Sequence, residues 1–214
     1  PPVICYLERG HGAAIRKART RLPSGNLSPV AVIQVPRERM IGSGIASSLI
    51  HEVGHQGAAL LNLVNSLRKE LRLKSRNSKD PLIWNLYYRW ISEIIADFWA
   101  MVHLGIGATL GLISVVSLPR YFMFRIKLDD PHPFPWIRVR LSVAFGNTIF
   151  PHQQWERLEE LWQYMYPLNK LEPKSLDIVE RLVKNLPEFV SLVINHSPPI
   201  LKGKRLIDIF PYKS

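Results

Sequence analysis

The chain has 214 residues, 47% of them hydrophobic, so it is large and apolar enough to bury a core, and a disordered tail is excluded. The formal net charge is +11, from 28 basic and 17 acidic residues. Cys5 is the single cysteine, which excludes an internal disulfide framework and favours a reduced, cytosolic setting without fixing it.

The excess positive charge is concentrated in two stretches. Residues 1–40 carry seven Arg or Lys against Glu8 and Glu38, and residues 68–79 carry six against Glu70. Such a surface can face an anionic membrane or an acidic partner, or it can simply be a solvated surface that aids solubility. Nucleic acid is the less expected partner, because the aromatic residues are not interleaved with the basic runs. Localisation stays open, with a cytoplasmic or membrane-associated protein favoured.

The N-terminal part predicts a small β element. The chain begins with Pro1 and not with Met, so we expect a processed or excerpted piece of a longer protein. Residues 31–35, AVIQV, form a β-branched run between Pro29 and Pro36, and this pattern predicts a strand.

Two long helices are predicted next. Apolar residues recur at helical spacing from 44 to 72 with no proline, which predicts one continuous helix. The polar residues 75–80 predict a loop. Residues 81–103 predict a second helix, with Pro81 in the first turn, where proline is tolerated.

An apolar run over residues 98–118 has no formal charge and is long enough to span a bilayer. Three glycines interrupt this run, and it continues directly from the preceding helix. These features favour a glycine-interrupted pair of buried helices over a membrane span, with membrane contact as the alternative.

The C-terminal part predicts further helices. Residues 118–141 are rich in proline and begin as a loop, and residues 136–145, WIRVRLSVAF, fit a helix or a strand. Residues 152–166 predict an amphipathic helix. Residues 175–186 predict another, with Ser175 as N-cap and with Pro187 breaking or kinking it.

The predicted fold is therefore mainly α with a small β element (α+β). We expect one domain over residues 1–150 and a helical C-terminal extension over 151–214, packed on the same domain.

The stretch HEVGH, residues 51–55, has metal-ligand spacing. On a helix His51 and His55 share a face and can hold one ion together. Glu52 lies about 100° round from His51, on the same side of the axis as His55. From there it can take a proton from a metal-bound water as a general base. Two surface or capping histidines are the alternative.

A third ligand for zinc is available on the second predicted helix. Glu93 and Asp97 are also four residues apart, so Glu93 can bind the ion while Asp97 accepts the ring N–H of a ligating histidine. A solvated helix face is the alternative. Large apolar neighbours such as Trp90, Phe98 and Trp99 argue against it, because a partly buried carboxylate needs a cation or donors.

His132 and Arg138 lie in a segment stiffened by prolines. A rigid His and Arg can donate hydrogen bonds to the oxyanion that forms when a carbonyl is attacked. The alternative is a structural loop in which Arg138 pairs with Asp129 or Asp130.

These motifs, in this order, resemble the gluzincin metallopeptidases, and among them the Ste24/HtpX-like peptidase family. The residues that carry the resemblance are His51-Glu52-Val53-Gly54-His55, then Glu93-Ile94-Ile95-Ala96-Asp97, then His132-Pro133 and Arg138. It covers roughly residues 30–140. The family's integral-membrane members have several clear spans, which this chain lacks, and the region after about 150 matches nothing in the family.

The resemblance implies a zincin-like core and a zinc metalloendopeptidase acting on a peptide or protein substrate. It implies Zn²⁺ bound by His51, His55 and Glu93, with Glu52 as the base. It also implies that Asp97 supports a ligand and that His132 and Arg138 stabilise the tetrahedral intermediate. By the same resemblance, residues 31–35 become an edge strand on which an extended peptide pairs; a plain core strand is the alternative.

The competing function is a basic membrane- or nucleic-acid-docking module on a peptidase-like scaffold, without proteolysis. A purely structural zinc would need four protein ligands, often cysteines, and Cys5 is far away in the sequence. An open, three-ligand site is therefore favoured.

Overall fold

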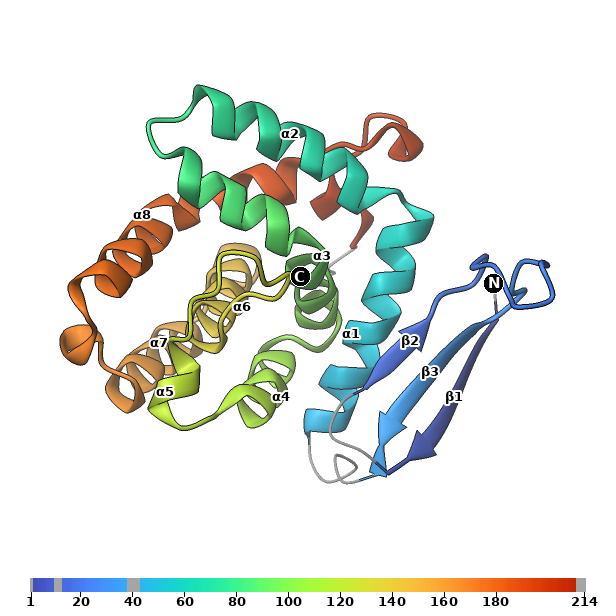
Figure 1. Cartoon of the computed structure of the whole chain (residues 1–214), viewed down its shortest axis with the longest axis horizontal. Helices are drawn as coiled ribbons and strands as arrows, with labels where there is room; N and C mark the ends of the chain where they lie inside the picture. The colour runs from blue at the N-terminus through green and yellow to red at the C-terminus, as the bar shows by residue number, and fades with distance from the viewer. Residues whose placement is uncertain (1, 10–12, 38–42, 211–214) are drawn as a thin grey trace.

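The computed structural model describes residues 2–9, 13–37 and 43–210, and within these ranges the chain is mainly helical with one small sheet. Pro1 and Glu38, noted above, lie outside the described residues. The sheet lies on one side of α1, and the other helices lie on the opposite side (Figure 1). The α+β class predicted from the sequence is confirmed.

The sheet has three strands in the order β1-β3-β2, formed by Val3–Glu8 (β1), Ala14–Arg16 (β2) and Ala31–Pro36 (β3). β1 is parallel to β3, and β2 is antiparallel to it. The strand predicted over residues 31–35 is confirmed as β3, whose Ala31, Ile33 and Val35 are buried.

β3 is the central strand, so the edge role expected for residues 31–35 is wrong and the core-strand alternative is right. The edge beside α1 is formed by β2, which the sequence did not reveal. β1 was missed as well, because its residues are exposed on both faces and show no alternation of apolar and polar side chains.

The helix predicted over residues 44–72 is two helices, α1 (Ser43–Leu60) and α2 (Leu63–Asn77). Asn62 adopts a left-handed conformation with φ 52°, which asparagine tolerates better than most residues, and it ends the continuity. The loop predicted over residues 75–80 is shorter than expected, because α2 continues to Asn77. Apolar spacing did not reveal the break, since Leu63, Leu67 and Leu71 continue a buried stripe.

α3 (Pro81–Leu104) and α4 (Ile106–Val116) confirm the predicted pair of helices, and Gly105 with φ 58° joins them. Ala100, Met101 and Leu112 from the apolar run are buried in the core. Within the described residues, no helix is both long and apolar enough to cross a bilayer.

The ambiguous segment after the proline-rich loop is a helix, α6 (Pro135–Ile149), and a short helix, α5 (Arg120–Met123), precedes it. α7 (Gln153–Met165) matches the helix predicted over residues 152–166. Three short 3-10 turns also lie in the C-terminal part of the described chain: Leu168–Lys170, Pro199–Leu201 and Leu206–Ile209.

α8 (Pro173–Asn195) continues through Pro187, so of the two predicted effects of this proline, a break or a kink, the break is wrong. Its N-cap is Glu172 and not Ser175. An internal proline costs a helix about 3 kcal/mol. Burial of apolar side chains on both sides of it, including Leu186, Phe189 and Val193, offsets that cost.

α3 is the centre of the molecule and packs against α1, α2, α4, α6 and α8. The C-terminal helices share its core: Phe189 of α8 stacks on Tyr87 of α3 with ring centroids 4.0 Å apart. The Tyr87 hydroxyl also donates a hydrogen bond of 2.8 Å to the carbonyl of Leu182.

Candidate metal centre

Gly54 lets α1 and α3 approach each other closely. A Cβ added at Gly54 would lie 2.7 Å from Cβ of Trp99 and 3.0 Å from Cα of Ala96, closer than normal packing permits. Glycine and alanine at this crossing therefore set the separation of the two helices. The crossing lies next to the two histidines of α1 and the two acids of α3.

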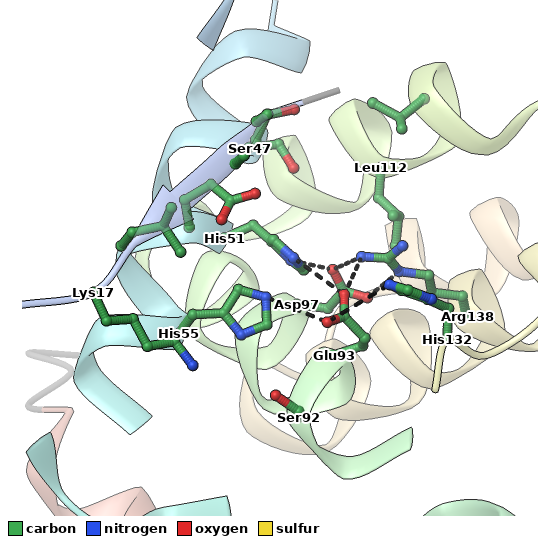
Figure 2. A pocket seen from close by; sticks show the side chains of 16 residues that line it. Lys17, Ser47, His51, His55, Ser92, Glu93, Asp97, Leu112, His132 and Arg138 are labelled. Atoms are coloured by element: carbon green, nitrogen blue, oxygen red, sulfur yellow. Dashed lines mark hydrogen bonds and ion pairs between the residues drawn. The ribbon is translucent and has the colours of Figure 1, made fainter. Parts of the chain in front are cut away.

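Two imidazoles and one carboxylate converge at this crossing. Nε2 of His51 lies 3.5 Å from Oε2 of Glu93, and Nε2 of His55 lies 3.4 Å from Oε1 of Glu93. One ligand atom from each of the three residues lies within 4.8 Å of the other two. Figure 2 shows both histidines pointing toward Glu93. In the described part of the chain, no other group of three or more metal-ligating side chains is this close.

Asp97 contacts the ring nitrogen of His51 that does not face Glu93. Its Oδ1 lies 2.7 Å from Nδ1 of His51, which leaves Nε2 directed at Glu93. Oδ1 also accepts a 2.8 Å hydrogen bond from Nη2 of Arg138, and Oδ2 accepts one from Nε. The arrangement is the carboxylate–histidine support expected for a ligating imidazole.

Charges in the site shift the pKa values of its acids. Burial opposes ionisation of Asp97, but Arg138 and His51 outweigh it and hold the pKa of Asp97 below its usual range. The pKa of Glu93 is lowered as well, since the neighbouring histidines and Arg138 outweigh its burial. The same carboxylates raise the pKa of Arg138 against its burial, so it stays cationic.

The two histidines are shifted in opposite directions. Burial lowers the pKa of His51, but Asp97 and Glu93 outweigh it and raise the value to about 9 in the metal-free site. Burial, reinforced by His51, lowers the pKa of His55 to about 4. Near neutral pH His55 is therefore a neutral imidazole with a free lone pair, the form that binds a metal.

His51, His55 and Glu93 line a cavity of about 530 Å³, and Glu52 lines it too. Only 7% of Glu52 is exposed, and burial raises the pKa of its carboxyl group. Within the described residues it forms no ion pair, so no cation holds its carboxylate there. A carboxylate with these properties, lining a cavity beside two imidazoles, can accept and return a proton.

His132 and Arg138 reach the cavity from the side opposite the HEVGH helix (Figure 2). Nε2 of His132 lies 4.0 Å from Oε1 of Glu93, and its Nδ1 lies 2.9 Å from Oδ1 of Asp130. Its side chain is 58% exposed, so it can meet a ligand. The alternative pairing of Arg138 with Asp129 or Asp130 is wrong, because the guanidinium binds Asp97 and Asp130 binds His132.

Three residues in or beside the cavity were not predicted from the sequence. Lys17 and Ser92 line the cavity. Gln56 anchors the strand edge, since its Oε1 accepts a 2.8 Å hydrogen bond from the backbone N–H of Ala18. Ser92 and Gln56 each adjoin a motif residue, a weak signal that was available. Nothing in the basic N-terminal stretch distinguishes Lys17 from its neighbours.

A second cluster has the appearance of a hydrolytic triad. The Ser66 hydroxyl lies 2.8 Å from Nε2 of His196, whose Nδ1 lies 2.7 Å from Oε1 of Glu70. The hydroxyl also lies 3.0 Å from the carbonyl oxygens of Asn62 and Leu63, and His196 is buried. His196 is the C-cap residue at which α8 ends, so these hydrogen bonds tie α2 to the end of α8.

The donor set at the helix crossing suits zinc. Two imidazole nitrogens and one carboxylate oxygen form a three-ligand set of the kind that leaves a position open for water or substrate. No protein-family model, curated protein or solved structure gives a significant match to this chain. The chemical interpretation therefore depends on the geometry of the site.

Proposed function

We propose that this chain is a zinc-dependent metallopeptidase with a zincin-like core. The observation that carries the proposal is the convergence of His51, His55 and Glu93 within 4.8 Å, in the cavity that Glu52 also lines. The order of the motifs, which resembles that of the Ste24/HtpX-like gluzincins, adds support.

His51, His55 and Glu93 would hold the ion. Zinc bound there would polarise a peptide carbonyl and lower the pKa of a water molecule. Glu52 accepts a proton from the attacking water and then delivers it to the leaving amine. Burial raises the pKa of Glu52, which makes its carboxylate a stronger base toward the attacking water.

The remaining residues stabilise charge and position ligands. His132 is exposed and lies at the cavity, and its Nδ1–H donates to Asp130, so Nε2 can donate a hydrogen bond to the oxyanion of the substrate when it also carries a proton. Arg138 contributes positive charge to the same cavity while it holds Asp97. Asp97 in turn keeps the His51 ring oriented.

Metal analysis and one isosteric substitution test the proposal. Purified protein should contain about one zinc per chain, and His55→Ala should lose it. Glu52→Gln should keep the zinc and lose peptide cleavage by about a hundredfold or more. Glu160→Gln, an exposed acid of α7, is the matched control and should cleave normally. Absence of zinc, or full cleavage by Glu52→Gln, would leave the docking module as the surviving function.

A further inference from the structure

The site cavity continues into a groove along α2. Lys17 and Ser92 line both the site cavity and a neighbouring pocket of about 350 Å³. That pocket shares Asn62, Asn65 and Arg68 with a third pocket, of about 490 Å³. Because each pocket shares lining residues with the next, the three lie in a row from the candidate metal centre along α2 and α3. We call its last two pockets the basic groove.

The basic groove carries uncompensated positive charge. Its cations are Lys17, Arg68, Lys69 and Arg72, and no acidic residue is among the described residues that line it. None of the four forms an ion pair with a carboxylate in the described part of the chain. By contrast, Lys74 on the same helix is paired with Glu188.

Two of the cations are held in place. The guanidinium groups of Arg68 and Arg72 lie over the Tyr88 ring, 5.4 Å and 5.2 Å from its centroid, and Arg72 donates a 2.8 Å hydrogen bond to the Tyr88 hydroxyl. Nε of Arg68 is buried and has no hydrogen-bond partner in the described residues. Such a donor is costly to leave unpaired, and a carboxylate would satisfy it.

We propose that the basic groove binds an acidic segment of a polypeptide that extends from the metal centre. That the segment belongs to a substrate rests on the proposed peptidase function. Fixed guanidinium forks match carboxylates, and the side chains of Asn62 and Asn65 can pair with a peptide backbone.

A polypeptide fits the groove better than a nucleic acid or a membrane. Guanidinium groups already lie over the ring of Tyr88, the one aromatic residue among the described residues that line the groove, so that ring is not free for base stacking. The cations lie in a recess between helices, which an extended chain can enter and a bilayer surface cannot. The recess also adjoins the cavity where the peptide bond would be cut, since Lys17 and Ser92 line both.

Peptide binding to the Glu52→Gln protein tests the proposal without depending on cleavage. The probe is a fluorescein-labelled peptide rich in glutamate, compared by anisotropy with the same peptide carrying glutamine at every glutamate. The acidic peptide should bind more tightly, and added salt should weaken it. Lys69→Glu and Arg68→Glu should each weaken binding by about tenfold. Lys69 is exposed, so its variant keeps the test valid if Arg68→Glu fails to fold.

Lys174→Glu is the matched control, since Lys174 is exposed on α8 and lines neither pocket of the groove. Equal binding of the two peptides, or equal affinities of Lys69→Glu and Lys174→Glu, would overturn the proposal. It would also be overturned if single-stranded DNA or phosphatidylserine vesicles bound as tightly as the peptide and lost affinity in the same variants. Acidic-peptide binding without any cleavage by the wild-type protein would refute the peptidase and leave the groove intact.

Discussion

Replacing Gly54 with alanine should push α1 away from α3 and damage the metal centre. In an open helix the exchange would stabilise the protein by about 1 kcal/mol, because alanine is the better helix former. Here the new methyl group would lie 2.7 Å from Cβ of Trp99 and 3.0 Å from Cα of Ala96. Overpacking costs about 1–3 kcal/mol, and the upper end applies because backbone atoms of α3 cannot rotate away. We expect a net loss of about 1–2 kcal/mol.

The loss of zinc affinity should be larger than the loss of stability suggests. Separating the helices moves His51 and His55 away from Glu93, and displaced ligands typically weaken metal binding by about tenfold to a hundredfold. Urea denaturation followed by tryptophan fluorescence gives the stability, and competition with a chromophoric chelator gives the zinc affinity. Gly107→Ala is the control, because its Cβ would meet nothing within 4 Å. The reasoning is refuted if Gly54→Ala matches this control in both measurements.

Three further predictions concern the support of the site and of the core. Asp97→Asn should cost about 3 kcal/mol in urea denaturation, because it leaves the buried cation of Arg138 with one ion-pair partner, Glu93, whose Oε2 lies 3.8 Å from Nη2; Asp208→Asn, in an exposed ion pair, should change little. Acid should destabilise the metal-free wild type more than it destabilises Asp97→Asn. The fold lowers the pKa of Asp97, so the contribution of its carboxylate to the free energy of unfolding is full above the ordinary value of 3.8. That contribution is lost as the pH falls toward the pKa of Asp97 in the folded protein. Unfolding free energies measured across the acid range would contradict this if the two proteins lost stability in parallel. Tyr87→Phe should cost about 1 kcal/mol through the lost bond to the Leu182 carbonyl, and an unchanged denaturation midpoint would show that this bond contributes nothing.

The site was the most predictable part of the molecule. The four-residue spacings of His51 with His55 and of Glu93 with Asp97 are properties of the helix, so the pairs could be placed on faces from the letters alone. That the two faces meet depends on the helix crossing at Gly54 and Ala96, which spacing does not encode. The hydrogen bond from Arg138 to Asp97 joins residues that are 41 apart in the sequence. The sequence alone offered two nearer partners for Arg138, Asp129 and Asp130.

The fold was less predictable wherever tertiary contacts outweigh local signals. The break at Asn62 lies within an uninterrupted apolar stripe, and only the left-handed backbone of one residue reveals it. Pro187 is a strong local signal for a helix end, yet packing of the flanking apolar residues overrides it. Lys17 reaches the cavity through the pairing of β2 with β3, a long-range contact with no sequence pattern of its own.

The stacking of Phe189 on Tyr87 has a practical consequence for anyone who shortens this chain. Tyr87 and Glu93 are six residues apart on one continuous helix, which is less than two turns, so α8 packs against the same helix that carries Glu93 and Asp97. A chain truncated near residue 150 would expose the hydrophobic face of α3 that α8 covers, and we expect it to aggregate. The last third of the protein supplies none of the candidate site residues, yet the helix that carries Glu93 and Asp97 depends on it for packing.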